Sequence, residues 1–236
     1  MSELGPPKKR FGQHFLKDPN TARIVASGVT KDDVVLEVGP GRGFLTTFLA
    51  KNAGLVHAVE LDPDVLPSLR EAVGERDNVR IHEGDALRFH YSDLDPAPNK
   101  LAANLPYNIA SPLVLRLLEE VETLRTLRFM VQLEVARRMG AERGSKDYAA
   151  YAVLAQLLAR VSISHRVPST VFDPPPRVHS AVVEMERREP PDDYVGIKRL
   201  VLGAFRSRRK RLVNNLPEPA RGPALAGCLR AVCDGF

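Results

Sequence analysis

The residues Asn104-Leu105-Pro106-Tyr107 place an amide, a proline and an aromatic ring directly after a short apolar run. The Asn side-chain oxygen accepts hydrogen bonds, the proline fixes φ and lacks a backbone donor, and the tyrosine offers a flat ring with a polar tip. Such a set can hold a flat group that carries an amine. Asn and Pro are also ordinary turn residues, so the interpretation depends on what surrounds these four.

A glycine-rich loop is the second candidate site. The apolar run Val34–Val38, which predicts a strand, is followed by Gly39, Gly41 and Gly43 and then by a predicted helix that starts at Phe44. A dinucleotide-binding loop would have its third glycine at the position of Phe44, and a phosphate-binding P-loop would need Gly-Lys-Ser/Thr, which is absent. The loop therefore favours a ligand without a pyrophosphate.

Two carboxylates follow the next two predicted strands. Glu60 ends the strand Leu55–Val59, about twenty residues after the glycine loop, where an acid can bind both hydroxyls of a ribose. Asp85 follows the strand Val79–His82 and can accept from the exocyclic amine of an adenine. Carboxyl ends of parallel strands meet at one edge of the sheet. These residues predict a site for a nucleoside cofactor that needs no phosphate.

The whole pattern predicts an α/β fold. A strand over Lys100–Ala103 brings Asn104 to the same sheet edge, and three more strands are expected over 127–131, 161–167 and 180–186. Helices are expected over Thr21–Val29, capped by Asp18 or Asn20, after Asp62-Pro63, and over 111–121, 132–139 and 148–161. The proline-rich segment 172–178 is expected to be a stiff loop.

A polar, proline-bearing segment follows Arg188 and predicts a domain boundary. We expect residues 1–188 to form an N-terminal arm and a catalytic domain, and residues 189–236 to form a small basic helical domain that binds RNA.

Composition excludes several classes of protein. Only 44% of the 236 residues are hydrophobic, and no apolar run has the roughly 20 residues of a membrane span. Residues 1–10 lack the apolar segment of a secretory signal, and the two cysteines fit neither a disulfide framework nor a zinc site. We therefore expect a cytoplasmic protein without a metal.

The net charge of +5 indicates a polyanionic partner. Two dense basic clusters favour nucleic acid over a merely solvated surface. They comprise Lys8, Lys9 and Arg10, and Arg206, Arg208, Arg209, Lys210 and Arg211.

Together these residues resemble the ribosomal RNA adenine N6-dimethyltransferases, and among them the small-subunit (KsgA-type) enzymes. The ordered set of motifs carries the resemblance: Arg-Phe-Gly-Gln-His-Phe-Leu, Glu-Val-Gly-Pro-Gly-Arg-Gly, Glu60, Gly-Asp-Ala, Asn-Leu-Pro-Tyr-Asn, Gly-Ser-Lys-Asp-Tyr and Phe-Asp-Pro-Pro-Pro-Arg-Val-His-Ser-Ala-Val-Val. The resemblance implies a Rossmann-like, S-adenosylmethionine-dependent methyltransferase with a mostly parallel seven-stranded sheet and a small C-terminal helical domain.

The family implies transfer of methyl groups from S-adenosylmethionine to the N6 amine of two adjacent adenosines near the 3′ end of small-subunit rRNA, during ribosome biogenesis. The expected partner is that rRNA or the immature small subunit, and we expect a monomer. The donor-binding residues that the resemblance implies are Gln13, His14, Leu16, Gly39, Gly41, Glu60, Leu61, Asp85, Ala86 and Asn104.

The resemblance also implies roles at the reacting centre. The side-chain oxygen of Asn104 and the backbone carbonyl of Leu105 would accept from the target amine, and Tyr107 and Phe172 would stack on the two faces of a flipped-out adenine. No strong general base is required. Where the family often has Asn after Gln13, this chain has His14, and a contact made through the backbone survives that change.

Two alternatives stay open. A large-subunit rRNA methyltransferase of the macrolide-resistance type shares much of the pattern, although Gly39-Pro40-Gly41 favours the small-subunit enzymes. A non-catalytic RNA-binding relative is the other, and the intact Asn104 and Tyr107 argue against it.

Overall fold

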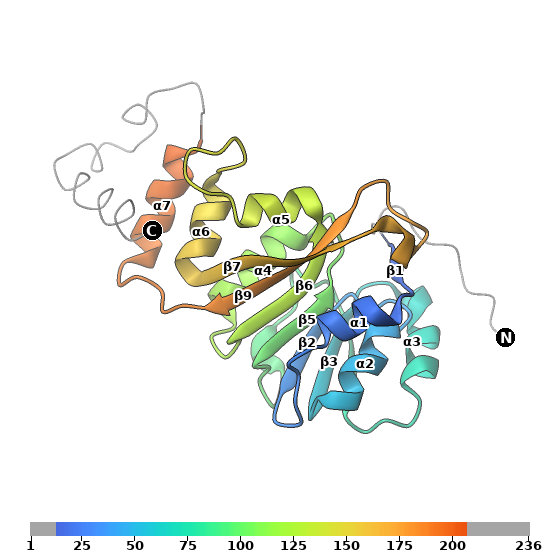
Figure 1. Cartoon of the computed structure of the whole chain (residues 1–236). Coiled ribbons are helices and arrows are strands. Elements are labelled where there is room, and N and C mark those ends of the chain that lie inside the picture. The colour runs from blue at the N-terminus through green and yellow to red at the C-terminus, as the bar shows by residue number, and fades with distance from the viewer. Residues whose placement is uncertain (1–12, 207–236) are drawn as a thin grey trace.

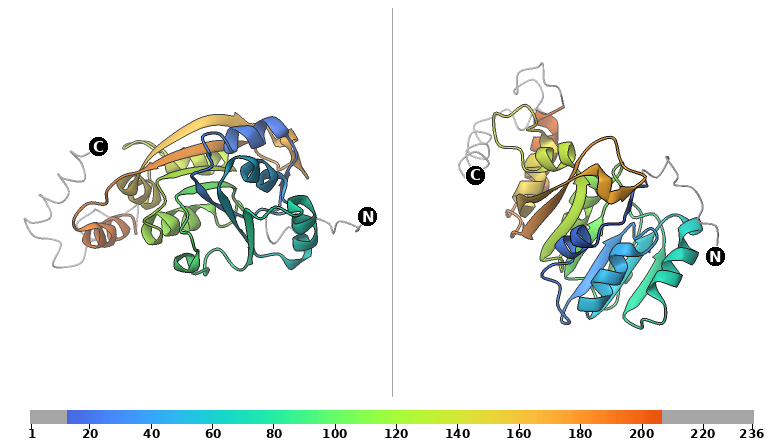
Figure 2. Two further views of the ribbon diagram at one scale, coloured as in Figure 1. Left: turned by 90° about the horizontal axis from the view of Figure 1, so that it is seen from below. Right: turned by 45° about the vertical axis from the view of Figure 1, so that its right-hand side comes forward.

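A seven-stranded sheet with helices on both faces forms the centre of the molecule (Figures 1 and 2). The structure is a computed structural model, and it describes residues 13–206. The sheet has the strand order β4-β3-β2-β5-β6-β9-β7. Its strands are β2 (Val34–Val38), β3 (Leu55–Glu60), β4 (Val79–Glu83), β5 (Lys100–Asn104), β6 (Thr126–Gln132), β7 (Ala159–Val167) and β9 (Ser180–Arg187).

The direction of the strands confirms the expected mostly parallel sheet. Strands β4, β3, β2, β5 and β6 pair in parallel, and β9 runs antiparallel to both of its neighbours, β6 and β7. Strands β2 and β5 are adjacent, but the connection after β2 leads to β3 on one side and the connection after β5 leads to β6 on the other. The two connections therefore diverge from the same edge of the sheet. Ligands of doubly wound folds bind at such a switch point.

Seven helices and three short 3₁₀ turns connect the strands in the described part of the chain. The helices are α1 (Pro19–Val25), α2 (Phe44–Asn52), α3 (Leu66–Val73), α4 (Ala110–Glu120), α5 (Leu133–Met139), α6 (Ala150–Leu158) and α7 (Tyr194–Ala204). The 3₁₀ turns are η2 (Pro63–Val65), η3 (Tyr91–Asp93) and η4 (Ser169–Val171). Of the two predicted caps, Asp18 and Asn20, the structure has Asp18, whose side chain accepts from the Thr21 N–H.

The two faces of the sheet support two apolar clusters, because successive side chains of a strand point to opposite faces. Val35 of β2 packs with α1 and α2 in one cluster, whereas Leu36 and Val38 pack with α4 and α5 in the other. The strands are therefore covered on both sides, which explains why they are continuous apolar runs rather than alternating ones.

Two segments differ from the sequence-based expectation. The helix predicted to reach Val161 ends at Leu158, because Ala159 is already extended and pairs with Arg187 of β9. The helix predicted to reach Val29 ends at Val25. In both places apolar residues beyond the helix contribute to the core without continuing the helix.

The predicted stiff loop begins with a short strand. Strand β8 (Phe172–Asp173) pairs antiparallel with β1 (Phe15–Leu16), so the N-terminal segment is joined to the proline-rich segment. This pairing spans more than 150 positions of the chain, and no local pattern predicts it.

Helix α7 lies beyond the domain boundary predicted after Arg188, and that boundary stays a prediction. Val201 of α7 packs with Val153 and Leu154 of α6. Glu119 of α4 accepts from the Tyr194 hydroxyl at 2.6 Å and pairs with Lys198 at 2.7 Å. Figure 1 shows α7 beside α6 at the end of the molecule away from α3.

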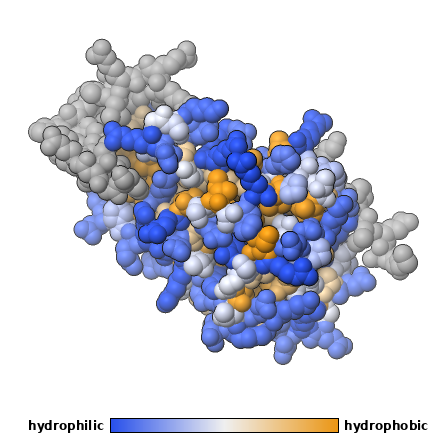
Figure 3. Space-filling view, viewed as in Figure 1, coloured by the Kyte–Doolittle hydropathy of each residue, from blue (hydrophilic) through white to orange (hydrophobic). Residues whose placement is uncertain are grey.

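The surface is mainly hydrophilic on the face that Figure 3 shows, with apolar side chains in small separate patches. Among the helices of residues 13–206, none is both long and apolar enough to span a bilayer.

Candidate functional site

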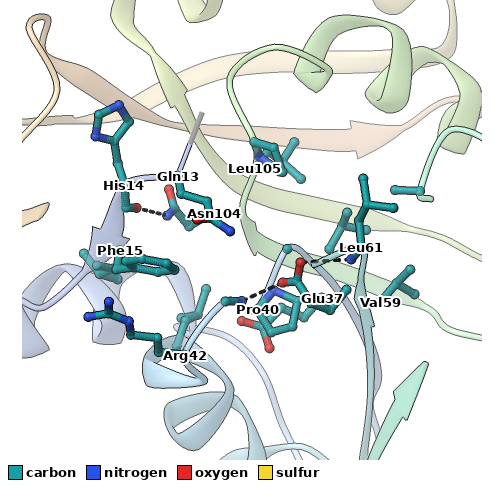
Figure 4. Close-up of a pocket in the computed structure, with 18 of the residues that line it drawn as sticks. Gln13, His14, Phe15, Glu37, Pro40, Arg42, Val59, Leu61, Asn104 and Leu105 are labelled. Carbon is teal, nitrogen blue, oxygen red and sulfur yellow. Dashed lines mark hydrogen bonds between the residues drawn. The ribbon is translucent and has the colours of Figure 1, made fainter. Parts of the chain in front are cut away.

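A cavity of about 580 Å³ lies at the switch point between β2 and β5, within the range of about 300–1,000 Å³ that small-molecule sites occupy. The N-terminal segment, the glycine loop after β2, the residues after β3 and β4, and the corner after β5 line it (Figure 4). All ten residues predicted to bind the methyl donor line this cavity, and so do Leu105 and Tyr107.

The glycine loop packs against the other segments of the site too closely for side chains. Gly39 has a φ of 70°, and a Cβ there would lie 3.0 Å from the Pro106 ring. Gly41 has a φ of 56°, and a Cβ there would lie 2.9 Å from the Phe15 ring. Glycine at these two positions thus lets the backbone of the loop approach both the corner after β5 and the N-terminal segment.

Glu60 organises the donor side of the cavity. Its carboxylate is 6% exposed and accepts from the backbone N–H groups of Gly41, Leu61 and Asp62, each at 2.9 Å. Burial raises the pKa of Glu60, although the three N–H groups favour the charged form. A carboxylate has about four lone-pair positions, so acceptor capacity remains for a ligand hydroxyl.

Asp85 and Leu61 form a second group at the cavity. The Asp85 Oδ1 accepts from the Leu87 N–H at 2.9 Å, which fixes the carboxylate at the cavity wall. Leu61 is 45% exposed and lines the same cavity. An apolar side chain and a carboxylate together suit a purine, whose faces are apolar and whose exocyclic amine donates.

Asn104 presents an acceptor without a partner. Its Nδ2 donates to the backbone oxygen of His14 at 3.1 Å, whereas its Oδ1 is buried and has no hydrogen-bond partner among the described residues. Figure 4 shows this bond and places the His14 ring away from Pro40 and Leu61. The His14 backbone therefore orients the amide, and the oxygen is left to accept from a ligand.

Tyr107 is fixed by contacts with two distant segments. Its hydroxyl lies 2.6 Å from the Ser180 Oγ, and its ring stacks on His14 with centroids 5.5 Å apart and an interplanar angle of 30°. Burial raises the pKa of Tyr107 above its usual value. The His14 ring is held in turn by a hydrogen bond between its Nδ1 and the Pro174 oxygen at 2.8 Å.

Phe172 does not lie where the sequence predicts. We expected its ring to form the second stacking face, but it is 0% exposed and packs in the cluster that contains Leu16 and Met130. It does not line the cavity. Its pairing with β1 draws the side chain into the core, so contact with a base would require the ring to leave that cluster.

Sequence reasoning did not single out Glu37, which lines the cavity. Its side chain is 1% exposed, and the Oε2 has no partner among the described residues. Burial, together with the charge of Glu60, raises the pKa of Glu37 to about 8. The sequence does contain an indication. Glu37 is a lone carboxylate in an apolar strand directly before a glycine loop, and burying such a group is costly unless it is paired or protonated.

Most of the predicted RNA-binding residues lie outside the described residues. These are Lys8, Lys9, Arg10, Arg208, Arg209, Lys210 and Arg211. Arg206 is described, is exposed and follows α7, away from the cavity lining. Residues 13–206 contain no group of three or more His, Cys, Asp and Glu side chains suited to a metal ion.

Comparisons with known proteins agree with this geometry. Residues 6–225 match the family described as ribosomal RNA adenine dimethylase. The chain is 73% identical to "Ribosomal RNA small subunit methyltransferase A" of Rubrobacter xylanophilus, over 94% of this chain and 86% of that protein. It is 40% identical to the protein of the same name from Alcanivorax borkumensis, over 89% of this chain and 77% of that one.

Solved structures show the same fold. A dimethyladenosine transferase from Plasmodium falciparum superposes with a TM-score of 0.76 at 27% identity, over 92% of this chain and 78% of that one. The 23S rRNA methyltransferase ErmE superposes with a TM-score of 0.70 at 29% identity, over 85% of this chain and 82% of that one.

The pKa of Glu37 predicts a pH dependence of stability. Between pH 4.5 and about 8 the native carboxyl keeps a proton that the unfolded chain has lost, so the free energy of unfolding falls as the pH rises through this interval. In Glu37→Gln this contribution is absent. Urea unfolding at about pH 5.5 and about pH 7.5 should show a fall roughly 1–3 kcal/mol larger in the wild type than in the variant. Equal falls in both proteins would contradict the prediction.

The burial of Phe172 predicts a loss of stability on truncation. Phe172→Ala leaves a cavity in the core and should lower the free energy of unfolding by about 3–5 kcal/mol. Phe172→Leu fills most of that space, so it should cost less and leave the KM for RNA unchanged. A raised KM for RNA in a stable Phe172→Leu protein would show instead that the ring contacts the base.

Proposed function

The chain belongs to the family of ribosomal RNA adenine dimethylases, and from this membership we propose that it transfers methyl groups from S-adenosylmethionine to the N6 amine of adenosines in small-subunit rRNA. The observation that carries the proposal is the Asn104 Oδ1, a buried acceptor on a cavity-lining residue that has no partner among the described residues. An acceptor held in this way needs a ligand that donates, and an exocyclic amine does so.

The small-subunit substrate is supported over the large-subunit alternative. Relatives that are 73% and 40% identical are named small-subunit methyltransferases, whereas identity to the large-subunit enzyme ErmE is 29%. Two adjacent adenosines near the 3′ end of the rRNA are the proposed targets. A monomer that works in the cytoplasm on the immature subunit stays a prediction.

The cavity suits S-adenosylmethionine in volume and in the chemistry of its lining. When bound, this cofactor supplies an electrophilic methyl group on a positively charged sulfur. Gly41 has no side chain, so the backbone of the loop could lie close to the cofactor. Glu60 retains acceptor capacity for ribose hydroxyls, and Asp85 and Leu61 suit the adenine ring. Gln13, His14, Leu16, Gly39 and Ala86 would complete the donor site.

Asn104 would prepare the target amine for attack. The amine lone pair is delocalised into the adenine ring, which makes the nitrogen a poor nucleophile. A hydrogen bond from the amine to the Asn104 Oδ1, and a second to the Leu105 carbonyl, would draw the lone pair out of that conjugation and stabilise the positive charge that develops on the nitrogen. Held in this way, the amine would direct its lone pair at the methyl group that the bound cofactor supplies, and its proton would pass to water.

Tyr107 would support the base while this happens. An adenine in a folded RNA must leave its stack to reach the cavity, and an aromatic ring restores about 1–3 kcal/mol of stacking per base. The Tyr107 ring lies beside Asn104 in the cavity wall, so the stacked base would present its amine to the acceptor oxygens.

Asn104→Ala tests the central role. We expect methyl transfer to fall by about 100- to 1,000-fold, as on loss of a group that stabilises a transition state. The dissociation constant of the donor should change by less than about threefold, because the other nine proposed donor-binding residues are unchanged. Radiolabelled methyl incorporation into unmethylated small subunits measures the first, and titration calorimetry measures the second.

The exposed Asn52 offers a matched control. Asn52→Ala should leave both quantities unchanged. Near-normal transfer by the Asn104→Ala protein would overturn the role given to the amide.

Glu60→Ala tests the donor side and should have the opposite effect. The dissociation constant of S-adenosylmethionine should rise by about 10- to 100-fold, because a charged hydrogen-bond acceptor is lost. The rate at saturating donor should change little. Glu71→Ala removes the same charge at an exposed position of α3 that does not line the cavity. This variant should bind the donor normally. An unchanged donor affinity in Glu60→Ala would exclude the assignment.

A further inference from the structure

Ser180 is a buried polar residue to which the mechanism above gives no role. It is the first residue of β9, is 0% exposed, and its backbone is paired with Gln132 of β6 and Val167 of β7. The residues that follow it, Ala181 and Val182, are buried and apolar. Burying a hydroxyl among apolar residues is costly unless it is hydrogen-bonded. The hydrogen-bond partner of Ser180 therefore indicates the role of its side chain.

That partner is the hydroxyl of Tyr107. The two oxygens lie 2.6 Å apart, although the residues are 73 positions apart in the sequence. Ser180 is held by strands on both sides, whereas Tyr107 lies in the connection between β5 and α4. The rigid partner is therefore the serine, and the residue whose position needs support is the tyrosine.

The His14 contact supports the face of the Tyr107 ring and not its hydroxyl end. His14 stacks on the ring face, and the face contact leaves the ring free to slide in its own plane. The hydrogen bond at the far end of the ring removes that freedom. Together the two contacts define both the plane and the position of the Tyr107 ring.

We propose that Ser180 is a positioning residue for the target base and that it acts by fixing the Tyr107 ring. The inference rests on the proposed function, in which the base stacks on that ring. A base on a displaced ring would present its amine at the wrong distance from the Asn104 Oδ1, and small errors of placement reduce rates strongly in reactions that depend on alignment.

A double-mutant cycle of Ser180→Ala, Tyr107→Phe and the double variant tests the proposal. The hydrogen bond is lost in each, so each single variant should lower kcat/KM for unmethylated small subunits by about 3- to 10-fold. The double variant should be no worse than either one. The dissociation constant of S-adenosylmethionine should stay within about twofold of the wild type, because the lost hydrogen bond joins two residues outside the proposed donor-binding set.

Ser164 on the neighbouring strand β7 provides a matched control, because its Oγ only reaches the Val182 backbone oxygen at 3.4 Å. Ser164→Ala should have normal kinetics. Thermal unfolding of all variants separates positioning from folding, since a purely structural bond would lower the melting temperature and leave kcat/KM unchanged.

The outcomes separate this inference from the proposed function. Normal kcat/KM in Ser180→Ala, or losses that multiply in the double variant, would overturn the role of Ser180. The proposed function would stand in that case if Asn104→Ala still lowered transfer by about 100- to 1,000-fold. If the wild-type protein transferred no methyl group to small-subunit rRNA, the proposed function itself would fail.

Discussion

The hydrogen bond from the Asn104 amide to the His14 carbonyl is the contact on which the site depends. An amide can present either its oxygen or its NH₂ group to a cavity, and only the oxygen can accept from an amine. Because the His14 carbonyl can only accept, it takes the NH₂ group and leaves the oxygen without a partner among the described residues. The rest of the fold brings these two groups together: β5 delivers Asn104, and the β1–β8 pair holds the N-terminal segment over it.

The donor side of the cavity combines buried negative charge with oriented backbone dipoles. Glu60 is stabilised by three N–H groups, whereas Glu37 has a raised pKa and an oxygen that has no partner within residues 13–206. Two carboxyl groups in one apolar wall repel each other when both are charged, which favours the protonated form of the more buried one. Because the raised pKa keeps most of the Glu37 carboxyl protonated at neutral pH, Glu60 supplies the negative charge on this side of the cavity, and the proposed partners of that charge are the ribose hydroxyls.

The parts of the site that follow from local sequence were predictable. Strand β2 has the predicted bounds, because a continuous apolar run bounded by glycines has few other structures open to it. Gly39, Gly41, Glu60 and Asp85 line the cavity because the ends of parallel strands meet at one edge. The burial of Phe172, the stacking of His14 on Tyr107 and the Ser180 bond depend on pairings between distant segments, which propensity and periodicity do not encode.

The predictable and the unpredictable residues belong to different halves of the site, one for the donor and one for the target base. The donor half is built from successive strand–loop–helix units, whose glycines and carboxylates lie a short distance apart in sequence. The half that would hold the base is assembled from the N-terminal segment, the corner after β5 and the start of β9. His14 and Asn104 belong to both halves, because each lines the cavity and is also proposed to contact the donor. The Ser180–Tyr107 bond joins two residues outside the proposed donor set, so this contact is the one expected to affect the presentation of the base and not the binding of the cofactor.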